Sequence, residues 1–358
     1  MNSYQKKNII YSIVLLSLVA IVWLFRQSSD DSSEEASKQV SFSGQTMGTV
    51  YNIKYLDEEE RSFKTSVDSL LEVFNQSVNH YLPESEISRF NHLDTLAENI
   101  AQGDTPGVDT LYFELPYFYP VLQKSQEVVE VTNGAFDPTV APLVNAWGFG
   151  PEGGELPDSL AVDSLLELVG FEMIQFNENF VTKTQPHVQL NFSAIAKGYG
   201  VDVIADFLSS KGIENMMVEI GGEVVCKGVN ARGEVWRIGI DDPAQSGNMS
   251  AAIAIHNRAI ATSGDYRNFY ERDGKRYSHT IDPKTGYPVK HSVLSVSVIA
   301  DNCMTSDAYA TAFMVMGLEA TKKVLETHPS LDVLIIYDEG GETKTFQTPG
   351  VEENLLEL

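Results

Sequence analysis

The chain has 358 residues, 43% of them hydrophobic and 21% charged, which is the composition of a folded globular protein and excludes a mainly disordered one. Its 50 acidic and 25 basic residues give a formal net charge of -25, and no run of Lys and Arg relieves this acidity, so nucleic acid is an unsuitable partner. Cys226 and Cys303 form neither a C-x-x-C pair nor a His-flanked spacing, which argues against zinc and leaves one disulfide or two buried thiols.

The N-terminal segment has the pattern of a membrane-targeting signal. Residues 9–25 form a nearly unbroken apolar run that follows two lysines and precedes an acidic, Ser-rich stretch. The length of the run fits a short membrane-spanning helix or a long signal-peptide core. No small-x-small cleavage site and no cysteine for lipid attachment follow it, so we expect an anchor at 1–27, a polar tether at 28–38 and a single domain at 39–350. The basic flank predicts that this domain lies on the periplasmic side of the inner membrane.

The body alternates short strand-like runs with helical runs, and no repeat of fixed length is visible. The apolar patterns predict strands at 49–55, 187–190, 216–220, 236–240, 251–256 and 292–300, the last of them half-buried. They predict helices at 63–77, 111–131, 194–208 and 307–316, with a loop-rich stretch at 83–110. Because strands and helices do not alternate strictly, the fold class is expected to be α+β rather than a doubly wound parallel sheet.

The most informative chemical pattern lies in the segment Ser306-Asp-Ala-Tyr-Ala-Thr311. Asp307 and Thr311 stand four residues apart and therefore share one face of a helix. A carboxylate and a hydroxyl near a helix N-terminus suit a hard cation such as Mg²⁺, and the same helix end favours phosphate. Asp307 taken alone fits a helix-capping charge equally well.

A second helix start has a similar character. The segment from Asn191 to Tyr199 leaves a strand and enters a helix, so free backbone N–H groups are expected to point outward there. Lys197 adds a mobile positive charge, although a single Lys in the first turns of a helix is usually only solvated. Together the two helix starts predict a site for magnesium and phosphate.

Several other short motifs have simpler explanations. Residues 148–153 match the G-x-G-x-x-G dinucleotide pattern, but no strand precedes them and prolines follow, so we interpret them as a loop. The segment Asp282-Pro-Lys-Thr-Gly286 specifies a turn before it specifies any ligand. His279, just upstream, is either a general base or an ordinary strand histidine.

Taken in order, the motifs resemble those of the ApbE-type family of FAD:protein FMN transferases. The resemblance runs over most of the body and is carried by Gln45-Thr-Met-Gly-Thr49, Ser88-Arg-Phe-Asn91, Asn133-Gly-Ala-Phe-Asp-Pro-Thr139, Trp147-Gly-Phe-Gly150, Ala194-Ile-Ala-Lys-Gly-Tyr199, Glu219-Ile-Gly-Gly222, Thr262-Ser-Gly264, His279-Thr-Ile-Asp-Pro283, Thr285-Gly286 and Asp307 to Thr311. Each string is weak evidence alone, but so many in the family's order leave little room for chance.

The resemblance implies an α+β fold of two closely packed lobes, with FAD in the cleft between them and Mg²⁺ at its pyrophosphate. The implied metal ligands are the side chains of Asp307 and Thr311 and the backbone carbonyl of Ala194. The implied flavin contacts are Met47, Tyr81, Ala135, Phe136, Asp137, Asn191, Lys197 and Ile281. Tyr81 and Phe136 offer ring faces for stacking, and Asp137 offers a polar group to orient the ligand. Asn191 departs from the family, where Asp is common, so a role that needs a carboxylate there is in doubt.

The activity implied by the resemblance is transfer of FMN from FAD to a Thr or Ser hydroxyl of a partner protein, with release of AMP. The resemblance favours His279 as the base that takes the hydroxyl proton, with Asp282 as the second choice. It suggests a subunit of a membrane electron-transport complex as the acceptor. Two other functions use the same residues: an FAD pyrophosphatase with water as the nucleophile, and a binding protein that keeps FAD intact.

Overall fold

The structure is a computed structural model that describes residues 38–93, 110–150, 156–243, 248–264, 269–272 and 275–356. The compact unit of the chain begins at Gln39. Among the helices in the described ranges, none combines the length and apolar character needed to cross a bilayer. The predicted anchor at 1–27 lies outside the described residues, as does all of the predicted tether except its last residue.

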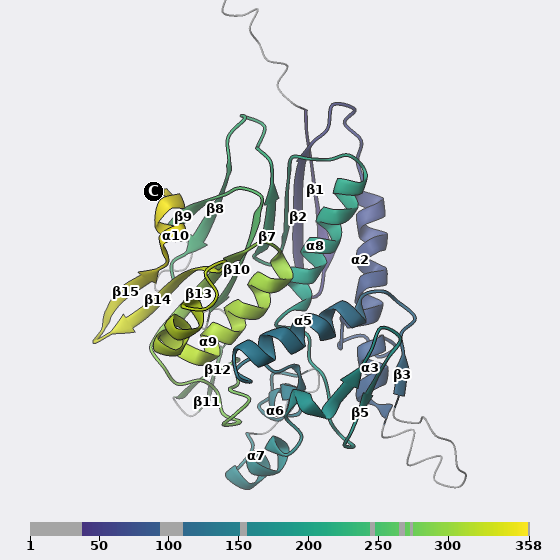
Figure 1. The fold of residues 1–358 in the computed structure, drawn as a ribbon, viewed down its shortest axis with the longest axis vertical. Coiled ribbons are helices and arrows are strands. Elements are labelled where there is room, and N and C mark those ends of the chain that lie inside the picture. Colours follow the sequence, from purple (N-terminus) through teal and green to yellow (C-terminus); the bar gives the residue numbers. More distant parts are fainter. Residues whose placement is uncertain are drawn as a thin grey trace, which may run out of the picture. The chain divides into compact units, whose positions relative to one another are not determined.

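An eight-stranded sheet, antiparallel throughout, forms the centre of the body (Figure 1). Its strands, in spatial order, are β1 (Gln39–Thr46), β2 (Thr49–Leu56), β6 (Met216–Ile220), β7 (Glu223–Lys227), β10 (Arg258–Gly264), β13 (Val293–Ala300), β14 (Asp332–Glu339) and β15 (Glu342–Gln347). An antiparallel sheet combined with separate helices confirms the predicted α+β class.

One face of this sheet is covered by the helices α2 (Lys64–Val78), α8 (Ala196–Ser210) and α9 (Cys303–Leu325), with α5 (Phe118–Val131) packed on α9 (Figure 1). Strand β2 shows how the sequence specifies this face. Tyr51, Ile53 and Tyr55 alternate along the strand and are buried under the helices, while the residues between them point the other way. The helices thereby bury two contiguous apolar clusters, which form most of the core.

A smaller sheet covers part of the opposite face. It consists of β8 (Trp236–Asp241), β9 (Met249–Ile255) and β16 (Leu355–Leu356), and the helix α10 (Pro349–Asn354) accompanies it. Its apolar side chains pack on those of β7, β10, β13 and β14. Strand β13 is therefore covered on both faces and almost completely buried, so the predicted half-buried pattern at 292–300 was wrong.

The remaining elements surround the core on one side and include a third sheet of three strands. They are β3 (Thr110–Tyr112), β4 (Ile174–Phe176), β5 (Phe180–Lys183), β11 (Phe269–Arg272), β12 (Lys275–Ser278), α3 (Glu86–Asn91), α6 (Ala141–Ala146), α7 (Ser159–Leu166) and the 3-10 helices η1 (Pro138–Val140) and η2 (Phe171–Met173). Cys226 and Cys303 are both buried and free, so they are two thiols rather than a disulfide.

Three predicted elements differ from the structure. Residues 187–190 form no strand, and His187 has a φ of 65°, which a strand does not adopt. The helix predicted at 111–131 begins only at Phe118, because β3 occupies the start of that range. The helix predicted at 307–316 begins earlier, at Cys303, although Gly317, with a φ of 72°, interrupts it where the sequence indicated.

Helices α8 and α9 pack closely together at Gly198. A Cβ atom at this position would lie 2.3 Å from the carbonyl oxygen of Cys303 and 2.7 Å from Cβ of Asp307. Both distances are far shorter than a normal van der Waals contact, and one of the clashing atoms belongs to the backbone. Only glycine therefore permits this helix pair.

We expect Gly198→Ala to lower the free energy of unfolding by about 2 kcal/mol or more, because the two helices must separate. At an unhindered position inside a helix, replacing Gly with Ala instead raises the free energy of unfolding by about 0.5–1 kcal/mol. Urea denaturation of the variant beside Ser210→Ala, an exposed position on the same helix, measures the difference. Equal midpoints for the two variants would show that the helices can shift without cost.

Candidate functional site

A cleft of about 1320 Å³ lies where the large sheet, the small sheet and the segment 135–149 meet. Every predicted site residue except Asp282 lines it. Those that line it are Met47, Tyr81, Ala135, Phe136, Asp137, Asn191, Ala194, Lys197, His279, Ile281, Asp307 and Thr311. Residues separated by more than 260 positions in the sequence thus face one space, which is the arrangement of a ligand site.

Asp307 and the start of α8 together free a backbone carbonyl. The N–H group of Gly198 donates to Oδ2 of Asp307 at 2.9 Å instead of bonding to the carbonyl of Ala194, four residues before it. Within the described residues no backbone hydrogen bond reaches that carbonyl. The Ala194 oxygen and the Asp307 carboxylate therefore line the cleft as neighbouring oxygen donors, which is the chemistry that a hard cation prefers.

Thr311 completes this group from the next turn of α9. Its Oγ1 lies 3.1 Å from Oγ of Ser263, which comes from the end of β10. The described residues contain no cluster of three or more His, Cys, Asp or Glu side chains. The donor group made by Asp307, Thr311 and the Ala194 carbonyl thus combines one carboxylate with a hydroxyl and a carbonyl group, and this combination suits Mg²⁺ rather than zinc.

The N-terminus of α9 is not open to phosphate, contrary to what its predicted start at Asp307 suggested. The N–H groups of Cys303 and Met304 donate to the two carboxylate oxygens of Asp202, each at 2.8 Å. The Asn302 side chain accepts the N–H of Thr305 at 2.9 Å. Asp307 lies in the second turn of the helix and is only 3% exposed. Burial, and not the helix N-terminus, therefore dominates the electrostatic environment of its carboxylate.

Lys197 is held between two carboxylates at the cleft wall. Its Nζ lies 2.5 Å from Oε1 of Glu223, a residue only 3% exposed whose buried Oε2 has no hydrogen-bond partner among the described residues. Burial opposes the charged form of Lys197, but Asp307 and Glu223 outweigh it and raise the pKa of this ammonium. Burial raises the pKa of Asp307, against the opposing effect of Lys197. A cation bound beside Asp307 would therefore stabilise a carboxylate that burial destabilises.

Met47 owes its position to a tight hairpin between β1 and β2. Met47 and Gly48 form the two-residue turn, with φ values of 47° and 71°, so both adopt the left-handed conformation of a type I′ turn. This gives a physical reason for the Met-Gly pair in the motif at 45–49. The turn carries Met47 to the cleft and packs its side chain against the core below.

The two aromatic residues predicted to stack on flavin differ in accessibility. Phe136 is only 3% exposed and belongs to the core, whereas Tyr81 is 56% exposed at the cleft rim. The Tyr81 ring lies against His80, with ring centroids 4.3 Å apart. The freely available ring face is therefore that of Tyr81, and Phe136 contributes an apolar wall.

Asp137 and Asn191 mainly organise backbone around the cleft. The carboxylate of Asp137 accepts the N–H and hydroxyl of Thr139 at 2.9 and 2.6 Å and the N–H of Phe171 at 3.0 Å. The side-chain oxygen of Asn191 accepts the N–H of Ser193 at 2.8 Å. An amide serves this turn as well as a carboxylate would, which accounts locally for Asn at this position.

The two candidate bases lie in different settings. His279 lines the cleft, and its ring makes an edge contact with Phe149, with centroids 6.4 Å apart. Asp282 does not line the cleft, because its carboxylate accepts the N–H of Lys284 at 2.9 Å and the hydroxyl of Thr285 at 3.0 Å. Asp282 thus holds the turn that the sequence indicated.

Two cleft residues had no role assigned from the sequence. Glu223 directly follows the motif Glu219-Ile-Gly-Gly222, and Ser263 lies within the motif Thr262-Ser-Gly264. One signal could have identified Glu223. It is a charged residue at the start of a strand, and the next three residues of that strand are buried. No local pattern predicts that it meets Lys197, 26 residues earlier.

The comparisons with known proteins agree with this geometry. The model of the ApbE family matches residues 47–335. The FAD:protein FMN transferase of Vibrio cholerae is 42% identical over 317 residues, covering 86% of this chain and 90% of that protein. The one from Haemophilus influenzae is 38% identical over 324 residues, covering 86% of this chain and 89% of its own length.

Solved structures show the same relationship. The flavin transferase ApbE from Vibrio cholerae superposes with a TM-score of 0.78 at 39% identity, over 89% of this chain and 99% of that one. The apo form of the Pseudomonas stutzeri flavinyl transferase ApbE gives a TM-score of 0.77 at 29% identity, over 89% and 97%. The resemblance noted in the motifs is thus confirmed across nearly the whole body, and the chain belongs to the ApbE family.

Proposed function

We propose that this protein is an FAD:protein FMN transferase, which moves FMN from FAD to a Thr or Ser hydroxyl of an acceptor protein and releases AMP. The proposal rests on the match to relatives that bear this name, over 86% of this chain and 90% and 89% of their lengths, combined with a cleft in which the corresponding motifs come together. The cleft joins apolar walls for a ring system to a group of oxygen donors suited to a cation at a diphosphate.

The residues present fit a magnesium ion. Asp307, Thr311 and the carbonyl of Ala194 would hold it, and the diverted N–H of Gly198 leaves that carbonyl available as a ligand. When bound, the ion would supply charge neutralisation at the diphosphate of FAD.

The side chains of the protein perform the remaining tasks. Tyr81 offers a ring face for stacking at the rim, and Lys197 supplies a fixed positive charge near the negatively charged substrate. The acceptor hydroxyl oxygen forms a bond to the phosphorus of the FMN half while the bond to the AMP oxygen breaks. The hydroxyl proton passes to His279, which lines the cleft, whereas Asp282 does not.

Co-expression with candidate acceptors tests this function. We expect a flavin-fluorescent acceptor band on a denaturing gel and one AMP released per FMN attached, both lost on adding EDTA. Rapid release of free FMN without any acceptor would instead identify an FAD pyrophosphatase. Bound FAD that never yields AMP would identify a binding protein.

We further propose that the acceptor is a subunit of a membrane electron-transport complex and that the transfer takes place on the periplasmic side of the inner membrane. The apolar run at 9–25 and its basic flank support this location. Protease treatment of intact spheroplasts tests it. Digestion of the body in intact spheroplasts is expected, and protection until lysis would contradict the proposal.

Glu223 is expected to control how readily the metal binds. In Glu223→Gln, Lys197 loses its ionic partner and pairs with Asp307 instead, which competes with the cation. The Mg²⁺ concentration for half-maximal AMP release should rise by about tenfold, with a smaller change in the rate at saturating Mg²⁺.

Glu326→Gln, at the far exposed end of α9, is the matched control and should leave the Mg²⁺ titration unchanged. A Glu223→Gln variant with an unaltered Mg²⁺ requirement would mean that the ion pair is structural only.

A further inference from the structure

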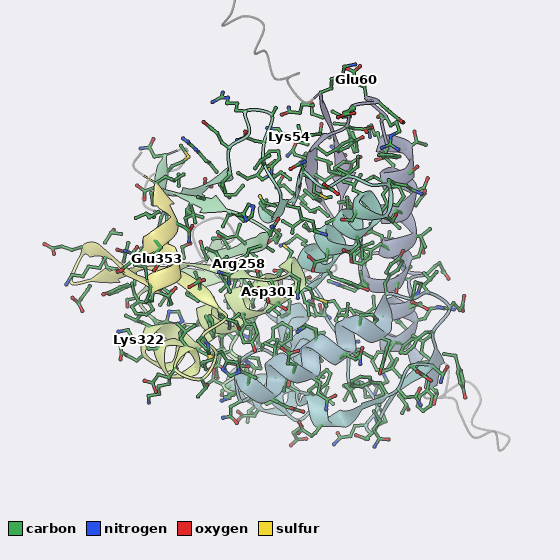
Figure 2. All side chains as sticks on the ribbon, turned by 45° about the horizontal axis from the view of Figure 1, so that its top comes forward. Lys54, Glu60, Arg258, Asp301, Lys322 and Glu353 are labelled. Carbon is green, nitrogen blue, oxygen red and sulfur yellow. The ribbon has the colours of Figure 1, made fainter. Side chains whose placement is uncertain are left out.

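Half of the outer face of the main sheet has no second layer over it within the described ranges. The small sheet covers β7, β10, β13 and β14, but the side chains on the outer face of β2 are exposed, among them Val50, Asn52 and Lys54. Lys54, two residues before the end of β2, is labelled in Figure 2. An open sheet face therefore adjoins the small sheet.

Strand β8 forms the border of this open face and is an edge strand. Among the described strands it pairs with β9 alone. Apart from that ladder, no backbone hydrogen bond joins residues 237–240 to another described residue. Arg237 and Gly239 are also exposed. An edge strand of this kind presents a row of unused N–H and C=O groups, which is a template for another extended chain.

The free edge of β8 is continuous with the reaction site. Arg237, Ile238 and Gly239 line the same cleft as Asp307 and Thr311, and so do the exposed Val50 and the half-buried Glu219. The cleft volume of about 1320 Å³ exceeds the range of about 300–1,000 Å³ that is usual for small-molecule sites. The cleft therefore has room for a second reactant beside a dinucleotide.

We infer that the acceptor protein binds as an extended segment along the free edge of β8, beside the exposed outer face of β2. This inference rests on the proposed function, because that reaction requires a polypeptide hydroxyl to enter the cleft. Backbone pairing supplies affinity without a specific side-chain sequence, and a segment lying on β8 leads directly towards the oxygen donors.

Hydrogen–deuterium exchange locates the docked segment. The probes are FAD alone and a synthetic peptide with one Thr flanked by Gly, Ala and Ser, each added to the whole protein in EDTA so that no transfer occurs. We expect the peptide, but not FAD, to slow exchange in the fragment that contains residues 236–241. If FAD alone slowed exchange at residues 236–241, β8 would belong to the flavin site. If exchange there slowed only as the protein concentration rose, β8 would bind a second copy of the chain. Either result overturns the inference, as does unchanged exchange at saturating peptide.

N-methylated peptides provide the functional test. In an antiparallel pair, alternate residues direct their N–H groups to the neighbouring strand, so methylation at one set of positions blocks pairing and methylation at the other set does not. Two peptides methylated one residue apart should differ by about tenfold in labelling efficiency, the effect of lost backbone hydrogen bonds. Equal labelling of both would contradict strand pairing. Failure of the proposed function looks different, because no peptide would then be labelled at all.

A photo-reactive residue in place of Arg237 gives independent confirmation, with the same group in place of Lys322 as the control. Lys322 lies on α9, well apart from Lys54 in the view of Figure 2. Cross-linking of the peptide at 237 and not at 322 is the expected result. Equal cross-linking at both positions would contradict docking on β8.

Discussion

Replacing Asp307 with Asn is expected to lower both AMP release from FAD and acceptor labelling by about 100-fold or more. The carboxylate is the only charged member of the proposed donor group, and removing one group that stabilises transition-state charge costs about 10²–10³ in rate. The amide can still accept the N–H of Gly198 at the position of Oδ2, so the junction of α8 and α9 is retained. The loss should therefore be one of metal binding and not of folding.

Two thermal melts distinguish these effects. Without metal, Asp307→Asn should melt at the same temperature as the natural protein or higher, because burial already disfavours the ionised carboxylate. With Mg²⁺, only the natural protein should gain stability. A variant that still gains stability from Mg²⁺ and still cleaves FAD would show that the ion binds elsewhere.

Replacing His279 with Ala is expected to slow acceptor labelling by about 10²–10⁴-fold, the usual contribution of a positioned general base. The binding of FAD should change much less, because the ring lies beside Phe149 at the cleft wall while the oxygen donors are on α9 and at the start of α8. Single-turnover labelling at saturating FAD and Mg²⁺ measures the chemical step, and FAD titration measures binding.

Asp282→Asn is the matched control for His279→Ala. The carboxylate of Asp282 serves the turn at 282–286, and an amide oxygen can accept the same N–H of Lys284. We expect this variant to keep most of its labelling rate. If Asp282→Asn lost as much activity as His279→Ala, or more, the proton would have to pass to the carboxylate.

The sequence predicted those parts of the fold that local patterns determine. The apolar pattern at 49–55 indicated β2, and the helix predicted at 194–208 matches α8, Ala196–Ser210, within two residues at each end. The strand predicted at 187–190 was wrong because a short apolar run of four residues fits several conformations. The left-handed backbone of His187 has no local signal in the sequence. The burial of β13 depends on a sheet formed by distant strands, which no pattern within 292–300 reveals.

The site was predictable to a similar extent. The four-residue spacing of Asp307 and Thr311 indicated a shared helix face, and both residues line the cleft. The carbonyl of Ala194 entered only through resemblance to a family, because its availability depends on Gly198 bonding to a carboxylate 109 residues away. The pairing of Lys197 with Glu223 is likewise a tertiary contact. Local pattern thus identified side chains with suitable chemistry, while the fold decided which partners they have.

We propose that this protein uses the oxygen donors on α9 and at the start of α8 to move FMN from FAD to a protein hydroxyl. The decisive measurement is the intact mass of a purified acceptor incubated with FAD, Mg²⁺ and the protein, with AMP quantified in the same sample. We expect one added FMN on Thr or Ser for each AMP released, abolished by EDTA and by Asp307→Asn. An acceptor of unchanged mass beside stoichiometric free FMN and AMP, or labelling that survives Asp307→Asn, would contradict it.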